Sequence, residues 1–172
     1  MSSTHSNTNL SNFPPPKEQT GTWPWVAPEV PSLKDPEAYP SISIITPNLN
    51  GGAYLEGTIR SVLLQAYPKL EYIVMDGGST DDSVDIIKKY VPWITYWECQ
   101  KDRGQPHAIN KGIEKATGNW IAYLNSDDLY LPFSLFDIAR GIQKHPQANW
   151  IAANTRVTDA EGNLLNTKKP DL

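Results

Sequence analysis

Cysteine is nearly absent from this sequence: Cys99 is the only one in 172 residues. No intrachain disulfide and no cysteine-based zinc site can therefore form. We expect the lone thiol to be a buried small hydrophobic side chain rather than a nucleophile. Long apolar runs are missing too, and none approaches the roughly 20 residues that a membrane-spanning helix needs. The N-terminus also lacks the positive-then-apolar order of a secretory signal, so a cytoplasmic protein is expected.

An excess of positive charge is also lacking, because 15 Lys and Arg face 19 Asp and Glu and leave a formal net charge of -4. No basic tract is visible. Nucleic acids and anionic membranes are held mainly by clustered Lys and Arg, so the sequence predicts no nucleic-acid partner.

Composition divides the chain near residue 40. Residues 1–40 hold eight of the fifteen prolines and begin with a Ser/Thr/Asn-rich stretch, which is typical of a largely disordered tail. An alternative stays open, in which the apolar Trp23, Trp25 and Val26 dock on the domain as a strap. Residues 41–172 are interpreted as one globular domain.

Within that domain, short apolar runs alternate with amphipathic stretches, which predicts an α/β fold. Strands are expected at 42–46, 72–75, 94–97, 120–124 and 150–153, with a hairpin turn at 159–163. Helices are expected between the first four strands and after Pro132. Repeated strand-helix alternation implies a mainly parallel sheet with helices on both faces.

Ligands of such sheets bind beyond the carboxyl ends of the strands, which here selects the loops 47–52, 76–82, 98–105 and 125–130. These loops carry a high density of carboxylates, amides and hydroxyls. Their polar residues are Asn48, Asn50, Asp76, Ser79, Thr80, Asp81, Asp82, Asp102, Arg103, Gln105, Asn125, Ser126, Asp127 and Asp128.

The motif LNSDD at 124–128 offers two adjacent carboxylates and an amide oxygen directly after a strand. This hard, oxygen-only set suits Mg²⁺ or Mn²⁺. Alternatively, Asn125 or Ser126 only caps a turn and the aspartates favour the positive end of the next helix.

The motif DGGSTDD at 76–82 places Asp76 at a strand end, where it could accept a hydrogen bond from a nucleobase N–H. Its glycines, Gly77 and Gly78, permit a sharp turn. Asp81 and Asp82 are better explained as first-turn helix residues.

The first loop, TPNLNGG, has neither a G-x-G-x-x-G pattern nor a Gly-rich loop ending in Lys-Ser or Lys-Thr. A dinucleotide dehydrogenase and a P-loop NTPase are therefore disfavoured. The interpretation that remains is a nucleotide held by strand-end side chains and a metal ion, because a divalent ion reverses the local negative charge.

Arg103 or Lys111 could neutralise phosphate, or each is an ordinary solvated cation. His107 is interpreted as a packing or capping residue.

The stretch from SISIITPNLNGG to VMDGGSTDD, followed by KDRGQPHAINKG and NWIAYLNSDD, resembles the family 2 glycosyltransferases. These are inverting, nucleotide-sugar-dependent enzymes with a Rossmann-like GT-A sheet. The resemblance covers roughly residues 41–128 and continues more loosely to the end of the chain.

The resemblance implies a role for each matching position. Thr46, Pro47 and Asn48 would line the base and ribose pocket, with Asn50 nearby. Asp76 would contact the base, and Asp102 and Arg103 would hold the base or the diphosphate. Asn125, Ser126 and Asp127 occupy the D-x-D position, where Asn125 departs from the acidic pattern. Asp127 would be the direct metal ligand, supported by Asp128.

The family reaction is a direct displacement at the anomeric carbon of the donor sugar, with a carboxylate base that deprotonates the acceptor. No such base can be assigned in this sequence, and we expect it to belong to an acceptor-binding part that the chain lacks. A UDP-sugar donor is favoured, with a saccharide or lipid-linked acceptor at the inner face of a membrane. One alternative is a noncatalytic sugar-nucleotide-binding module. A nucleotidyltransferase is disfavoured, because the first loop has no Arg or Lys.

Overall fold

The computed structural model of the chain describes residues 10–16, 22–29, 35–159 and 163–170. The chain divides into two compact units, residues 1–134 and 135–172. The first unit contains a four-stranded sheet in the order β3-β2-β1-β4, and every neighbouring pair is parallel. Its strands are β1 (Ile42–Asn48), β2 (Leu70–Asp76), β3 (Tyr96–Cys99) and β4 (Trp120–Tyr123).

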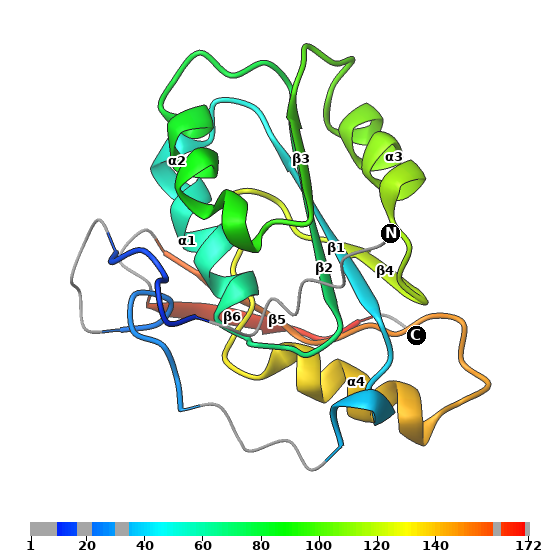
Figure 1. Cartoon of the computed structure of the whole chain (residues 1–172). Coiled ribbons are helices and arrows are strands. Elements are labelled where there is room, and N and C mark those ends of the chain that lie inside the picture. The colour runs from blue at the N-terminus through cyan, green and yellow to red at the C-terminus, as the bar shows by residue number, and fades with distance from the viewer. Residues whose placement is uncertain (1–9, 17–21, 30–34, 160–162, 171–172) are drawn as a thin grey trace. The chain divides into compact units, whose positions relative to one another are not determined.

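A helix follows each of the first three strands: α1 (Gly52–Leu63), α2 (Ser83–Tyr90) and α3 (Gln105–Lys115). Helices α1 and α2 lie together on one side of the sheet, and α3 packs on β1 and β2 from the other side (Figure 1). Two short 3-10 helices, η1 (Pro36–Ala38) and η2 (Val91–Trp93), complete this unit. The predicted parallel α/β fold with helices on both faces is confirmed.

The central strand β1 is buried along its whole length, as expected for a strand that is covered on both faces. The predicted apolar stripe of α1 is also buried, with Leu55, Ile59, Val62 and Leu63 at most 1% exposed. On the other face α3 approaches β1 so closely that a Cβ on Gly112 would lie 2.5 Å from Cγ2 of Ile45. The third strand begins at Tyr96, two residues later than predicted.

The second unit contains the strands β5 (Thr155–Thr158) and β6 (Leu164–Lys168), which pair antiparallel. Helix α4 (Ser134–Lys144) leads into it, with Leu135, Ala139 and Ile142 buried along one face. The strand predicted at 150–153 is wrong, because β5 begins only at Thr155. Its apolar run includes two alanines, whereas β5 carries the β-branched residues that favour strands. Of the predicted turn at 159–163, residues 160–162 lie outside the described residues; Asp159 N–H donates to the carbonyl of Asn163 at 3.0 Å.

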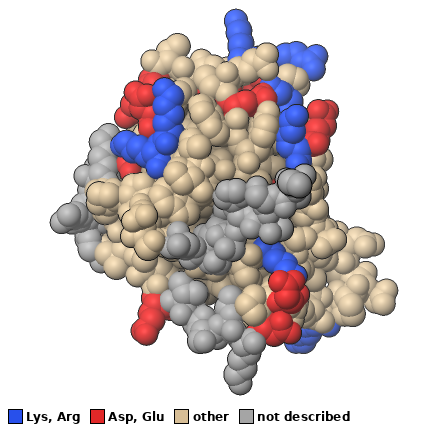
Figure 2. Space-filling model, viewed as in Figure 1, with Lys and Arg blue, Asp and Glu red and all other residues tan. Residues whose placement is uncertain are grey.

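The surface view shows Lys and Arg interspersed with Asp and Glu around the face in Figure 2. Within the described ranges, every helix is too short or too polar to cross a membrane. Among residues 1–40, the described Pro24 is buried, and the indole of Trp23 donates to the carbonyl of Tyr130 at 2.7 Å. The domain boundary at residue 40 stays a prediction.

Candidate functional site

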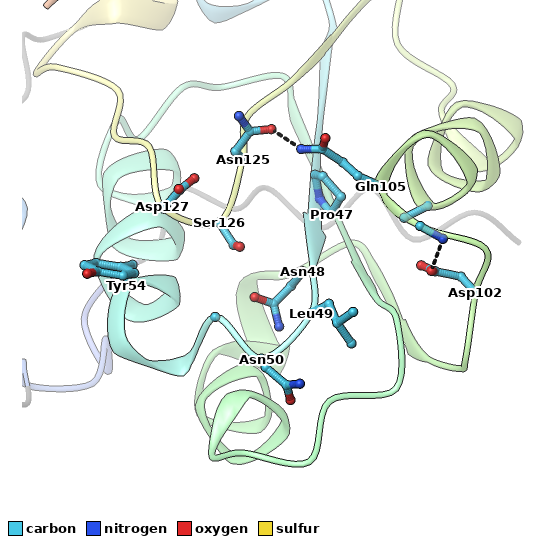
Figure 3. Close-up of a pocket in the computed structure, with 13 residues that line it drawn as sticks. Pro47, Asn48, Leu49, Asn50, Tyr54, Asp102, Gln105, Asn125, Ser126 and Asp127 are labelled. Atoms are coloured by element: carbon cyan, nitrogen blue, oxygen red, sulfur yellow. Dashed lines mark hydrogen bonds between the residues drawn. The ribbon is translucent and has the colours of Figure 1, made fainter. Parts of the chain in front are cut away.

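A pocket of about 350 Å³ opens beyond the carboxyl ends of the parallel strands. It brings together three of the four predicted loops, those after β1, β3 and β4 (Figure 3). Its lining residues are Pro47, Asn48, Leu49, Asn50, Gly51, Tyr54, Asp102, Gly104, Gln105, Ala108, Asn125, Ser126 and Asp127. The volume lies at the small end of the range for small-molecule sites.

Asn48, the last residue of β1, is 4% exposed and has a fixed amide orientation. Its Nδ2 donates to Oδ2 of Asp76 at 2.7 Å and lies 3.3 Å from Oγ of Ser79. Because Nδ2 is engaged on that side, Oδ1 points the other way, and it is buried without a hydrogen-bond partner among the described residues. Such an orphaned acceptor in a pocket wall is suited to a ligand N–H or O–H.

Gly51 permits this arrangement, since a Cβ at residue 51 would lie 2.3 Å from Oδ1 of Asn48 and 2.9 Å from Oγ of Ser126. Only a residue without a side chain allows both polar groups to approach the start of α1. Gly51 is therefore part of the pocket wall rather than a mere turn residue.

Asp76 lies beneath the pocket wall and is not among the lining residues. Its carboxylate accepts hydrogen bonds from the backbone N–H of Gly78 and of Ser79 and from the Ser79 hydroxyl, at 2.7 to 3.0 Å. Burial raises the pKa of Asp76, but hydrogen bonds from Ser79, Cys99 and Asn48 outweigh it and hold the pKa below its ordinary value. The structure thus makes Asp76 an ionised anchor for Asn48.

Cys99 ends the edge strand β3 and is register partner to Asp76. The expectation of a buried thiol is wrong, because Cys99 is exposed. Its position at the end of an edge strand leaves one side of the residue uncovered. The adjacent Asp76 carboxylate, more than partial burial, raises the pKa of the Cys99 thiol.

Asp102 brings a carboxylate to the pocket from the loop between β3 and α3. Its Oδ1 accepts from the N–H of Gly104 at 2.7 Å, and Gly104 adopts a φ of +102°. The missing side chain of Gly77 leaves space for this carboxylate, whose oxygens would lie 3.0 and 3.3 Å from a Cβ there. The glycine therefore serves Asp102, in addition to the turn that the sequence suggested.

The loop after β4 forms the opposite wall of the pocket. Oδ1 of Asn125 accepts from Nε2 of Gln105 at 2.8 Å, which joins this loop to the start of α3 (Figure 3). Nδ2 of Asn125 donates to Oδ2 of Asp128 at 3.0 Å. With both ends of its amide engaged, Asn125 acts as a connector within the site. Asp127, in contrast, is exposed and lines the pocket.

The fit of a divalent cation can be judged from the charges on this loop. Partial burial and the charge of Asp127 raise the pKa of Asp128, against the opposing hydrogen bond from Asn125. A cation beside two repelling carboxylates would relieve that repulsion, and their oxygens are hard ligands. No group of three or more His, Cys, Asp or Glu suited to a metal occurs among the described residues. The residues therefore fit an ion that takes most of its ligands from a bound diphosphate and water, as Mg²⁺ commonly does.

Four of the predicted donor-binding residues do not line the pocket: Thr46, Asp76, Arg103 and Lys111. Thr46 is fully buried, and its hydroxyl oxygen accepts from the Tyr72 hydroxyl at 3.1 Å. Lys111 forms an ion pair with Glu98. Arg103 is exposed, and its backbone N–H donates to Nδ1 of His107 at 3.3 Å. His107 therefore caps the start of α3. Asp128, the second predicted metal ligand, is also outside the lining.

Several lining residues are not among those expected from the sequence to bind the donor or the metal, notably Tyr54, Leu49 and Gln105. Tyr54 and Leu49 are 65% and 59% exposed, which is high for large apolar side chains. Gln105 belongs to the polar loop residues that the sequence singled out, but only the fold shows that it reaches Asn125. For Tyr54, the available signal was its place in the first turn of the helix that follows β1.

Parallel strands with helices on both faces and a polar pocket at the carboxyl ends of the strands define a Rossmann-like α/β fold of the GT-A kind. Residues 43–169 match the model of Glycosyl transferase family 2, and the chain belongs to that family.

Among curated relatives, the chain is 39% identical over 94 residues to the putative teichuronic acid biosynthesis glycosyltransferase TuaG of Bacillus subtilis. This match covers 52% of the chain and 36% of TuaG, so the chain spans well under half of that relative.

Two solved structures have similar folds. The crystal structure of S. aureus TarS matches 62% of this chain and 20% of TarS, with a TM-score of 0.57 and 29% identity; its residues 1–349 are also solved in complex with UDP. The mannosyltransferase PcManGT from Pyrobaculum calidifontis, in complex with GDP-Man and Mn²⁺, matches 73% of this chain and 37% of its own, with a TM-score of 0.57 and 24% identity.

Proposed function

We propose that this chain forms the donor-binding part of an inverting glycosyltransferase that moves a sugar from a nucleotide-sugar, a UDP-sugar being favoured. The acceptor would be a saccharide or a lipid-linked sugar, handled in the cytoplasm at the inner face of a membrane. The observation that carries the proposal is the single pocket into which Asn48, Asp102 and Asp127 all open. TarS and PcManGT, solved with UDP and with GDP-Man, support the same class of donor.

The base end of the pocket is defined by two hydrogen-bond acceptors. Oδ1 of Asn48 is orphaned, and Asp102 is an acidic side chain held by Gly104. Acceptors in a pocket wall bind ligand N–H and O–H groups and disfavour ligand lone pairs. Uracil, thymine and guanine each carry a ring N–H at a position where cytosine presents a lone pair. An acceptor that faces this ring position favours UDP-, dTDP- or GDP-sugars over CDP-sugars.

The diphosphate end of the pocket is assigned to the loop after β4. Asp127 would hold Mn²⁺ or Mg²⁺, with Asp128 as a supporting or alternative ligand. Such an ion stabilises negative charge on a departing diphosphate. Ser126 would bind the donor beside it, Asn125 keeps the loop joined to Gln105, and Pro47 and Asn50 complete the wall at the β1 side.

A catalytic base is not assigned. In the described lining of the pocket the carboxylates belong to Asp102 and Asp127, and both are used on the donor side. We infer that deprotonation of the acceptor falls to a group outside these residues. A chain that binds donor and transfers nothing would instead be the noncatalytic sugar-nucleotide-binding module.

The test is a ligand-observed NMR screen of UDP-, dTDP-, GDP- and CDP-sugars in the presence of Mg²⁺. We expect saturation transfer to at least one of the first three and little to the CDP-sugar. Asn48→Ala should weaken the signal, whereas Asn119→Ala, at the opposite end of the sheet where Oδ1 accepts from Ser41, should not. Binding to none of the four sugars would overturn the proposal, and equal binding to all four would overturn the assignment of the base end.

A further inference from the structure

Two polar side chains of α1, and a third just beyond its C-terminal end, hold the backbone of residues 126–131. The Thr58 hydroxyl lies 2.8 Å from the carbonyl oxygen of Ser126 and 2.9 Å from that of Asp128, so its single proton is shared between them. One and two turns further along, Oγ of Ser61 accepts from the N–H of Tyr130 at 3.2 Å, and Nε2 of Gln65 donates to the carbonyl of Leu131 at 2.9 Å. We call residues 126–131 the acidic loop.

The Ser126 carbonyl belongs to the peptide group that precedes Asp127. The peptide group that follows Asp127 is held as well, because the Asp128 N–H donates to the carbonyl of Asn125 at 3.1 Å. Fixing the peptide groups on either side of a residue fixes the direction in which its Cα–Cβ bond points. Thr58 is 0% exposed, so its hydroxyl is shielded from competing water. The contact therefore controls the orientation of the one carboxylate of this loop that lines the pocket.

A second group reaches the acidic loop from the N-terminal part of the chain, residues 22–26, which we call the strap. Nε1 of Trp23 donates to the carbonyl of Tyr130 at 2.7 Å. Beside it, Pro24 and Trp25 lie 4.0 and 3.9 Å from the position of a Cβ on Gly57, and Leu129 of the acidic loop lies 3.4 Å from it. Strap and acidic loop thus meet over the same glycine, next to Thr58.

Arg60 anchors the strap to α1. Its guanidinium donates to the carbonyls of Pro24, Trp25 and Pro14 at 3.1, 3.4 and 2.8 Å, and lies over the rings of Phe13 and Trp25. Arg60 is only 3% exposed, and it also donates to the Tyr90 hydroxyl, which in turn donates to Glu56. A buried cation that depends on strap carbonyls for its hydrogen bonds favours the docked strap strongly.

We propose that Thr58 and Trp23 are positioning residues for Asp127: α1 and the docked strap together hold the acidic loop in the geometry that metal and donor require. This inference rests on the proposed function, because it assigns these residues a role in holding the metal ligand. Outer contacts of this kind orient ligands and influence metal affinity without touching the ion.

The first test is hydrogen exchange in the ligand-free full chain, which depends on the loop alone and on no bound donor. Thr58→Val removes the hydroxyl at similar volume, and Trp23→Phe removes the indole N–H while keeping an aromatic ring. Both should accelerate exchange of the Asp128 and Tyr130 amides, and Thr58→Ser should restore the parent rate. Tyr67→Phe is the matched control, since its hydroxyl donates to the carbonyl of Pro40 at 2.7 Å, away from the acidic loop. Unchanged exchange at both amides in folded Thr58→Val and Trp23→Phe would overturn the inference.

The second test measures the Mn²⁺ concentration that half-saturates UDP binding. Thr58→Val should raise it about tenfold, as expected for loss of an outer contact to a metal ligand. Trp23→Phe should raise the half-saturating Mn²⁺ concentration by a smaller factor. Tyr67→Phe should lower the melting temperature and leave the half-saturating Mn²⁺ concentration unchanged. Equal half-saturation in folded Thr58→Val and the parent would contradict the positioning role. A parent that binds no UDP with Mn²⁺ would refute the preference for a UDP-sugar donor, and the exchange rates would still decide whether Thr58 and Trp23 hold the loop.

Discussion

Nδ2 of Asn48 donates to Oδ2 of Asp76 at 2.7 Å, across the ends of the two central strands of the sheet. The two residues are register partners, so the parallel pairing itself places them side by side. Asp76 determines which way the Asn48 amide points, and the buried Asn48 oxygen is thereby turned away from Asp76, toward Gly51 of the pocket wall. A buried carboxylate outside the lining of this pocket can thus control the orientation of a pocket residue.

Replacing Asp76 tests this relationship through stability. Asp76→Asn removes the charge that accepts the hydrogen bonds from Asn48, Ser79 and Gly78, and should lower the free energy of unfolding at pH 7 by about 2 kcal/mol. The pKa of Asp76 is lowered in the folded state. Its contribution is therefore fully present above the unfolded-state pKa, about 3.9, and is lost as the pH falls through the folded-state value.

Urea unfolding at several pH values provides the measurement. The difference between parent and Asp76→Asn should be constant above about pH 5 and shrink as the pH falls below about 4. A difference that does not change with pH would show that the ionised carboxylate is not the stabilising species.

Gly51→Ala should damage the pocket directly. The new Cβ would lie 2.3 Å from Oδ1 of Asn48 and must displace it. Losing that acceptor should weaken nucleotide-sugar binding about tenfold, the equivalent of one net hydrogen bond. Gly57→Ala is the control, because a Cβ there meets only ordinary contacts of 3.4 Å and more. Isothermal titration of both variants is decisive, and equal affinities would refute the role given to Asn48.

Two glycines inside helices should respond oppositely to alanine. Gly112→Ala places a Cβ 2.5 Å from Ile45 of the central strand and should cost about 2 kcal/mol through overpacking. Gly57→Ala has room and should stabilise α1 by up to about 1 kcal/mol. Chemical unfolding gives both values. A stabilising Gly112→Ala would mean that α3 does not pack on β1 as closely as described.

The sequence and the structure give Lys111 different roles. The sequence allowed it to neutralise phosphate, whereas the structure pairs it with Glu98, away from the pocket lining. Lys111→Met should therefore change UDP affinity less than about twofold and lower stability by about 1 kcal/mol or less. A loss of UDP affinity of tenfold or more would show that Lys111 takes part in donor binding.

The sequence predicted the α/β fold well because β1 and α1 carry unambiguous periodic patterns. All three loops that line the pocket are among the four that the sequence selected, since parallel strands bring their carboxyl ends to one edge. It could not separate Asp76 from Asp102, because both follow predicted strands and only the fold shows that Asp102, and not Asp76, lines the pocket. The contact between Trp23 and Tyr130 spans 107 positions, which no local pattern encodes. The strand expected at 150–153 failed because a short apolar run does not by itself specify strand pairing.

The central claim is that Asp127 holds a divalent ion for a nucleotide donor in this pocket. Calorimetric titration of UDP with Mn²⁺ and with EDTA, for the parent, Asp127→Ala and the exposed control Asp85→Ala, tests it most directly. The parent and Asp85→Ala should bind UDP more tightly with Mn²⁺, and Asp127→Ala should bind equally in both conditions. An Asp127→Ala variant that keeps the full Mn²⁺-dependent gain would contradict the account.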